Sequence, residues 1–149
     1  MELVAATLRP LRHKVVVPLP INDLSSSKVL VMDFIEGTPM SELREKMRHV
    51  SEAQRRIGGR MILGSLAQAY GHMLFAGGPL HADCHPGNIL VLPGAKIALL
   101  DYGQIKHMTD AEVAGFARLI TLVGEDKGDA EVSGRPWKVS SYWLWSDLI

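Results

Sequence analysis

The stretch that decides the fold is His81-Ala82-Asp83-Cys84-His85-Pro86-Gly87-Asn88, followed further along by Asp101-Tyr102-Gly103. Phosphoryl transfer needs oxygen-bearing side chains at fixed places and little covalent chemistry from the protein. In catalytic loops with an Asp-to-Asn spacing of five, the Asp orients the acceptor hydroxyl, and the Asn and a downstream Asp hold magnesium on the nucleotide phosphates. The spacing therefore predicts a phosphotransfer site in which Asp83 is the catalytic carboxylate and Asn88 and Asp101 are the metal ligands.

The two histidines that flank Asp83 can be interpreted in two ways. Alternate residues of an extended loop point the same way, so His81, Asp83 and His85 would suit a transition-metal site. No further His/Cys cluster completes such a site in the sequence, and Pro86-Gly87 bends the chain directly afterwards. We therefore expect both histidines to pack and to form hydrogen bonds. Cys84, the sole cysteine, is expected to be a small buried side chain rather than a nucleophile.

The segments around this loop predict alternating strands and helices. Apolar runs at 14–17 and 29–32 predict two strands, and the second is expected to be buried and to lead into a turn at 33–37. Ser51 and Gln54 form a capping box that opens a long helix to about residue 76, where two glycines and a proline stop it. The other predicted elements are short helices within 1–12 and 41–49, a hairpin of 89–92 and 96–100 around Pro93-Gly94, and a helix opened by Thr109 and Glu112.

The composition is that of an ordinary globular chain. Its 149 residues amount to about one domain, with 47% hydrophobic and 21% charged residues. Lys+Arg and Asp+Glu both number 16, so no basic surface is indicated and we expect no nucleic-acid partner. A single cysteine excludes an intramolecular disulfide. No apolar run approaches the roughly 18 residues of a membrane-spanning helix, and the N-terminus lacks a signal-peptide core.

With these residues in view, the chain resembles the UbiB/aarF-domain-containing (ADCK) atypical kinase family. The segments that carry the resemblance are Val17-Pro18, residues 29–37, residues 81–91 and residues 99–104, in the family's order. The H-x-D-x-H-P-G-N-I-L signature is specific, and the segment at 29–37 is moderately so. Two positions depart from the family pattern: Cys84 stands where Pro is usual, and Asp33 stands where Glu is common.

The resemblance implies an α+β, protein-kinase-like fold that binds ATP and Mg²⁺ and acts as an ATPase or an unorthodox kinase. By position in the motifs, Asp83 takes the catalytic role, and Asn88 and Asp101 take the metal roles. The hinge between the lobes would face the adenine. The implied nucleotide-binding residues are Asp33, Phe34 and Ile35 of the hinge together with Asn88 and Asp101.

The resemblance also implies a cellular setting that the sequence alone does not fix. Members of the family support ubiquinone or other prenylquinone biosynthesis in mitochondria, plastids or bacteria, often at membranes. The implied partners are therefore a nucleotide and either isoprenoid-quinone precursors and related lipids or proteins of quinone biosynthesis.

The chain departs from the family most strongly in what it lacks. The family's K-x-G-Q helix, its Ala/Gly-rich nucleotide loop, its strand lysine and its partnering helix glutamate belong upstream of Lys14, where only thirteen residues stand. We therefore expect a truncated kinase-like domain with impaired activity at 1–124. The small-lobe strands and the hinge would occupy residues 14–37, and part of the helical large lobe would occupy residues 38–124. An atypical tryptophan-rich tail at residues 125–149 would lie outside the fold.

Two other functions stay open at this point. A small-molecule phosphotransferase of the aminoglycoside or choline type also uses H-x-D-x-x-x-x-N followed by an aspartate at a strand end. The Tyr102-Gly103-Gln104 sequence and the segment from Met32 to Gly37 favour the ADCK-like interpretation. The missing upstream lysine also permits a non-catalytic remnant that binds a partner.

Overall fold

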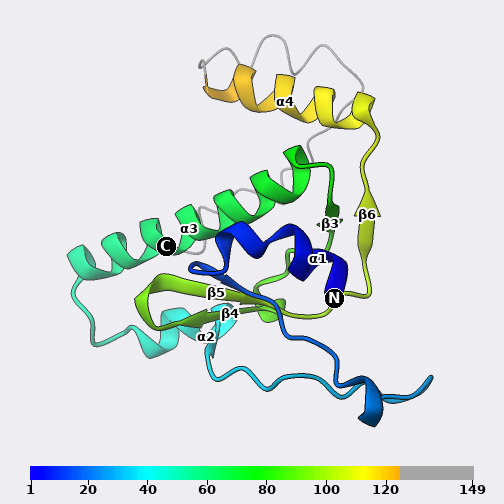
Figure 1. The fold of residues 1–149 in the computed structure, drawn as a ribbon. Helices are drawn as coiled ribbons and strands as arrows, with labels where there is room; N and C mark the ends of the chain where they lie inside the picture. Colours follow the sequence, from blue (N-terminus) through cyan, green and yellow to red (C-terminus); the bar gives the residue numbers. More distant parts are fainter. Residues whose placement is uncertain (125–149) are drawn as a thin grey trace. The chain divides into compact units, whose positions relative to one another are not determined.

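The computed structural model describes residues 1–124, and its ribbon is drawn in Figure 1. The described chain divides into two units, residues 1–107 and residues from 108 onward, and each unit is described by itself. The tail predicted at 125–149 lies outside the described residues. None of the helices within residues 1–124 combines the length and the apolar character that crossing a bilayer requires.

The first unit contains both α-helices and short strands. Its α-helices are α1 (Glu2–Thr7), α2 (Met40–Lys46) and α3 (Glu52–Phe75). Its strands are β1 (Val15–Val16), β2 (Thr38–Pro39), β3 (Pro79–His81), β4 (Ile89–Leu92), β5 (Lys96–Leu99) and β6 (Ile105–His107). Single 3₁₀ turns cover Arg9–Leu11 (η1), Asn22–Leu24 (η2), Pro86–Asn88 (η3) and Pro93–Ala95 (η4).

A four-stranded sheet in the order β1-β5-β4-β2 forms the centre of the first unit. The hairpin predicted at 89–100 is confirmed: β4 and β5 pair antiparallel around η4, with Ile89 opposite Leu99. β1 joins this hairpin in parallel, with Val15 opposite Ile97. A separate antiparallel pair, β3 with β6, brackets the D-Y-G segment and the loop at residues 82–88, which is named the catalytic loop after the prediction made for Asp83.

The core of the first unit lies between α3 and the β4–β5 hairpin (Figure 1). The side chains that are almost wholly buried come from α3, from β1 and from the hairpin, with two more from α1 and the residue after it. These core residues are Val4, Leu8, Val15, Ile62, Leu66, Ala69, Met73, Leu74, Ile89, Ile97, Ala98 and Leu99. At about 25 cal/mol per Å² of buried apolar area, this cluster supplies the main stabilisation of the unit.

Local interactions begin and end α3 as the sequence predicts. The Ser51 hydroxyl accepts from the backbone N–H of Gln54, and the Gln54 side chain accepts from the backbone N–H of Ser51. At the other end Gly77 adopts φ +71°, a left-handed conformation that glycine takes without strain. β3 then begins at Pro79, so the helix end points the chain directly into the catalytic loop.

The prediction of a strand at 29–32 is wrong. Residues 29–31 form no strand, and Met32 makes only an isolated antiparallel bridge to Pro20. Val29 and Leu30 are more than half exposed rather than buried. The ladder is incomplete because side chains take two of the N–H groups that it would use: the Val31 N–H donates to the Ser25 Oγ, and the Leu19 N–H donates to the Asp33 Oδ2. The segment 18–37 instead forms a loose ribbon that extends from the sheet (Figure 1).

The second unit is described as far as α4 (Asp110–Gly124). The capping box predicted at its start is confirmed. The Glu112 carboxylate accepts from the backbone N–H and the hydroxyl of Thr109, at 2.9 and 3.0 Å. The apolar face predicted from Val113 to Ile120 is present as a pattern, but within residues 108–124 no side chain of α4 is buried.

Candidate active site

The catalytic loop connects β3 to β4 and is fixed by its own backbone at both ends. The backbone N–H of Ala82 donates to the carbonyl of Gln104 at 2.9 Å, which continues the β3–β6 pairing. The 3₁₀ turn η3 closes the loop, and His85 caps this turn because its Nδ1 accepts from the backbone N–H of Gly87 at 3.0 Å. A Cβ on Gly87 would lie 3.0 Å from the same Nδ1, so only glycine fits this cap without a shift.

Asp83 and Asn88 meet inside this loop, as the spacing predicts. The Asn88 Nδ2 donates to the Asp83 Oδ2 at 3.1 Å. An ionised carboxylate can only accept, so the amine of Asn88 must face Asp83 and its amide oxygen stays available to a cation. The amide NH₂ group of Asn88 therefore fixes the loop by its hydrogen bond to Asp83. Both side chains are half-buried, which leaves them accessible to a ligand.

Asp101 lies directly after β5 and adopts a left-handed backbone conformation, with φ +48°. Its Oδ1 accepts from the backbone N–H of Gly103 at 3.0 Å, and this bond stabilises the turn. The backbone N–H of Leu100 donates to the carbonyl of Asn88 at 2.7 Å. This bond connects the residue before Asp101 to Asn88, the other predicted metal ligand. The Asp101 side chain is exposed.

His81 joins the loop to the backbone at Asp101. The residue is 1% exposed, and its Nε2 lies 2.8 Å from the carbonyl oxygens of both Leu100 and Asp101. Its Nδ1 lies 3.2 Å from the Tyr70 hydroxyl of α3. The expected packing and hydrogen-bonding roles are therefore confirmed for His81. For His85 the hydrogen bond is confirmed by its cap on η3, but the residue is exposed, so the packing expected of it is wrong. Within residues 1–124, no three His, Cys, Asp or Glu side chains gather as a metal site.

Tyr70 and Tyr102 are the residues of this region whose roles the sequence did not reveal. Both rings stand perpendicular to the His81 ring, with centroid distances of 6.4 Å for Tyr70 and 5.2 Å for Tyr102. The Tyr102 hydroxyl donates to the carbonyl of Leu99 at 2.7 Å. A tyrosine on the buried face of a helix needs a partner for its hydroxyl, and that requirement was the available signal for Tyr70.

Burial sets the protonation of three groups around the loop. Burial, with a smaller contribution from a hydrogen bond to Cys84, raises the pKa of Tyr70 far above its ordinary value. Burial likewise raises the pKa of Tyr102. Burial raises the pKa of the Cys84 thiol, and a hydrogen bond with Tyr70 opposes that rise in part. All three groups are therefore neutral near pH 7, in agreement with the expectation that Cys84 is not a nucleophile.

The predicted hinge residues lie on the ribbon and bond within it. The Asp33 Oδ2 accepts from the backbone N–H of Leu19 at 2.9 Å, and the Asp33 backbone N–H donates to the Leu19 carbonyl at 3.0 Å. Phe34 is 93% exposed, and Ile35 is half-buried. The ribbon joins the hairpin only beyond Ile35, where Pro39 of β2 pairs with Leu90. Asp33, Phe34 and Ile35 are thus not brought into the Asp83–Asn88 contact.

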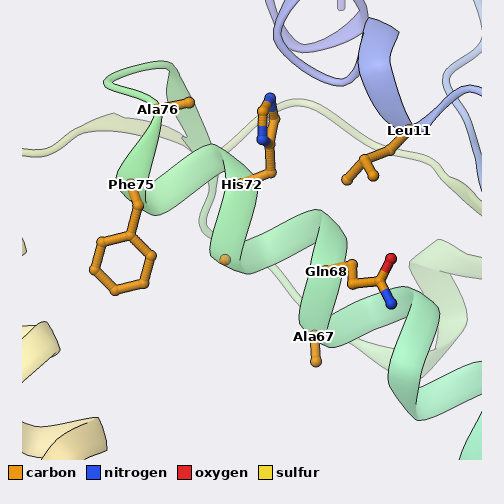
Figure 2. Close-up of a pocket in the computed structure, with 7 residues that line it drawn as sticks. Leu11, Ala67, Gln68, His72, Phe75 and Ala76 are labelled. Atoms are coloured by element: carbon orange, nitrogen blue, oxygen red, sulfur yellow. The ribbon is translucent and has the colours of Figure 1, made fainter.

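A separate open groove lies along α3 and contains none of the predicted site residues. In Figure 2, His72 and Phe75 point to different sides of the helix, and Leu11 lies across from Gln68. Gln68 also accepts a hydrogen bond from the Lys14 Nζ at 2.9 Å. The groove is lined by Leu11, Ala67, Gln68, Gly71, His72, Phe75 and Ala76.

Comparisons with known proteins give a consistent result. The family model described as the ABC1 atypical kinase-like domain matches residues 1–131. AarF domain-containing kinase 1 of Drosophila melanogaster is 31% identical over 138 residues, covering 76% of this chain and 26% of the relative. The Arabidopsis thaliana protein ACTIVITY OF BC1 COMPLEX KINASE 3, chloroplastic, is 33% identical over 113 residues, covering 75% of this chain and 15% of that protein. The chain thus spans only 26% and 15% of these two relatives.

A solved structure is similar in fold. The Rv3197–erythromycin complex from Mycobacterium tuberculosis matches 86% of this chain and 31% of its own chain, with a TM-score of 0.54 and 24% sequence identity. At that identity the likeness concerns the fold. It agrees with the α+β, protein-kinase-like architecture predicted from the catalytic loop and the D-Y-G segment.

Proposed function

The chain belongs to the ABC1 atypical kinase-like family, and from that membership we propose that residues 83–101 form a site for ATP and Mg²⁺. Asp83 would act as the catalytic carboxylate, and Asn88 and Asp101 would hold the metal. The observation that carries the proposal is the 3.1 Å hydrogen bond between Asn88 Nδ2 and Asp83 Oδ2. It leaves the Asn88 amide oxygen free for a cation, close to the backbone that leads into Asp101.

The chemistry of the three side chains suits magnesium. Mg²⁺ prefers oxygen ligands, and it is usually held by one or two carboxylates together with substrate phosphates and water. Asn88 offers one amide oxygen, and Asp101 offers an exposed carboxylate with one oxygen bonded to Gly103. When bound, the metal neutralises charge on the phosphate oxygens. A site of this kind leaves coordination positions for a nucleotide.

The residues of the loop would then act by position rather than by covalent chemistry. Asp83 would accept a hydrogen bond from the hydroxyl group that receives the phosphoryl group, or from water if the reaction is hydrolysis. Asn88 would hold that carboxylate in orientation through its amine. His81, through its contacts with the backbone of Leu100 and Asp101, would keep the second ligand in place.

The finer parts of the proposal concern the hinge and the biological setting. We propose that Asp33, Phe34 and Ile35 face the adenine, since Gly37 leads the ribbon onto β4, the strand that follows Asn88. A Cβ on Gly37 would lie 3.0 Å from the Leu90 Cβ, which indicates how closely the ribbon approaches β4. Family resemblance further supports a role in ubiquinone or prenylquinone biosynthesis, with isoprenoid-quinone precursors or the proteins of that process as partners.

A thermal shift measurement on the full chain tests the nucleotide proposal. We expect millimolar ATP with Mg²⁺ to raise the melting temperature, because a ligand at tenfold its Kd stabilises a protein by about 1.4 kcal/mol. ATP without a divalent cation should raise it less. Asp101→Ala should abolish the difference between the two conditions, whereas Asp23→Ala, which removes an exposed carboxylate from η2, should preserve it.

The same variants separate binding from turnover. Asp83→Asn can still accept the hydrogen bond from Asn88, so its nucleotide-dependent shift should survive while phosphate release is lost. Hydroxylated small molecules and isoprenoid-quinone precursors are the acceptors to add in the phosphate-release assay. Absence of any shift at millimolar ATP with Mg²⁺ would contradict the proposal and favour a non-catalytic binding module.

A further inference from the structure

We propose that Tyr70 is a positioning residue for the proposed metal site, because its hydroxyl holds His81 in the tautomer that clamps the backbone of Leu100 and Asp101. The importance of Asp101 as a metal ligand rests on the proposed function. The tautomer of His81 does not, since it follows from hydrogen-bond geometry alone.

The two carbonyls favour a proton on Nε2 of the His81 ring, and the partner of Nδ1 determines whether this tautomer is the sole one populated. Nε2 lies 2.8 Å from the oxygens of both Leu100 and Asp101. A carbonyl oxygen only accepts, so an Nε2 without hydrogen would place its lone pair against two other lone pairs. Nε2 must therefore donate, shared between the two oxygens. In a neutral imidazole the other nitrogen, Nδ1, is then an acceptor that needs a donor.

Tyr70 is the donor that geometry offers to Nδ1. Its hydroxyl lies 3.2 Å from Nδ1, and His81 is 1% exposed, so water has little access to the ring. The other acceptor beside Tyr70 is the Cys84 thiol, and sulfur accepts hydrogen bonds more weakly than an imidazole nitrogen. The hydroxyl of Tyr70 keeps its proton at every physiological pH because burial raises its pKa. Nδ1 would otherwise be a buried acceptor without a partner.

The hydrogen bonds from His81 Nε2 act on Asp101, the proposed metal ligand whose backbone is in the left-handed region. Asp101 has φ +48°, a region that side chains other than glycine seldom adopt and that persists where surrounding contacts impose it. The Nε2–H of His81 holds the carbonyl of Asp101 and the carbonyl before it. Tyr70 thus connects α3, the longest helix of the described chain, to the conformation of Asp101.

Tyr102 supplies a matched control, because its ring also packs edge-on against the His81 ring. Its ring lies closer to His81 than that of Tyr70, at 5.2 Å against 6.4 Å between centroids. Its hydroxyl donates elsewhere, to the Leu99 carbonyl. Tyr102→Phe therefore removes a half-buried hydroxyl beside His81 without touching either ring nitrogen, whereas Tyr70→Phe removes the contact to Nδ1.

The test uses the full chain labelled with ¹⁵N in its histidine rings, in slightly alkaline buffer where a free imidazole is neutral. The ¹⁵N shifts of the two ring nitrogens report which one carries the proton, and the His81→Gln variant identifies the His81 signals. We expect only the Nε2–H form in the unaltered chain and in Tyr102→Phe. In Tyr70→Phe we expect a second, Nδ1–H population and a loss of about fivefold in affinity for ATP with Mg²⁺, the effect of about one hydrogen bond.

Each outcome bears on the inference separately from the proposed function. An unaltered chain whose His81 carries its proton on Nδ1 overturns the inference without any variant. A Tyr70→Phe protein with His81 purely in the Nε2–H form overturns it too, as does an equal change of tautomer in Tyr102→Phe. If the tautomer responds as expected but no variant binds nucleotide, the positioning of the backbone stands and the proposed function fails.

Discussion

Among single side chains, the contact between Asp83 and Asn88 shows how one hydrogen bond assigns roles. The carboxylate can only accept, so the amine of Asn88 turns toward it and the amide oxygen turns away. The same reasoning applied to His81 places its proton on Nε2. These assignments depend on heavy-atom distances and on the donor and acceptor properties of the groups, and they make the proposed site directional.

Cys84 offers a pH-dependent test of the environment inside the loop. Burial raises the pKa of its thiol, so the folded chain holds less thiolate than an unfolded one at the same pH. We expect iodoacetamide to alkylate the folded chain more slowly than the urea-unfolded chain at about pH 8.5, the ordinary thiol pKa. The rate of the folded chain should still increase at pH values where the unfolded chain has reached its plateau.

The chain has a single cysteine, so mass spectrometry of the whole protein reports this reaction without ambiguity. Equal rates for the folded and unfolded chains would mean that Cys84 is as accessible and as acidic as a free thiol. That result would contradict its placement beside Tyr70 in the loop.

Among the helices and strands, α3 has well-defined ends, but the residues between them have a low helix propensity. Its capping box and the glycine after Ala76 fix its length. Four glycines, at positions 58, 59, 64 and 71, lie within it, and each costs up to about 1 kcal/mol relative to alanine in a helix. The burial of its apolar face against the hairpin must therefore offset a low helix propensity.

Replacing two of these glycines should stabilise the protein. A Cβ added at Gly64 or Gly71 meets nothing within 4 Å, so Gly64→Ala and Gly71→Ala should each raise the free energy of unfolding by about 0.5–1 kcal/mol. The matched control is Gly78→Ala, whose Cβ would lie 2.5 Å from the Thr7 side chain and should destabilise. Urea unfolding of the three variants measures these differences. A loss of stability in both helix variants would show that α3 is packed more closely at these positions.

For the first unit as a whole, the core and the ribbon differ in what they contribute. The buried residues come from α3, β1, the hairpin and the N-terminal turns, while the ribbon at 18–37 exposes most of its large apolar side chains. β1 reaches the sheet by pairing in parallel with β5, across some eighty residues of chain. Stability and the proposed adenine contact of the hinge at 33–35 therefore belong to different parts of this unit.

Substitutions in the core and in the ribbon should therefore differ in their effect on the free energy of unfolding. Leu66→Ala removes a side chain that is 5% exposed and should cost about 2–5 kcal/mol in the free energy of unfolding. Phe34→Ser changes a side chain that is 93% exposed and should alter that energy by less than about 0.5 kcal/mol. Chemical denaturation followed by circular dichroism distinguishes the two. A large loss of stability in Phe34→Ser would mean that the ribbon is part of the core.

The catalytic loop was predictable because its contacts are short in sequence. The bond between Asp83 and Asn88 spans five residues, the His85 cap on η3 spans two, and the capping boxes span three. Spacing alone determines which groups meet at such separations. The hairpin register follows for the same reason, since Pro93-Gly94 fixes its turn.

The sequence by itself thus determined the order of Asp83, Asn88 and Asp101, the ends of α3 and the family to which the chain belongs. Only the tertiary structure decided that Tyr70 meets His81, that β1 pairs with β5 and that the segment 29–32 remains without a ladder. A strand needs backbone partners that are distant in sequence, and in this segment the Ser25 hydroxyl takes the Val31 N–H that a ladder would use. An apolar run does not by itself predict burial, because burial depends on which other parts of the chain pack against the segment.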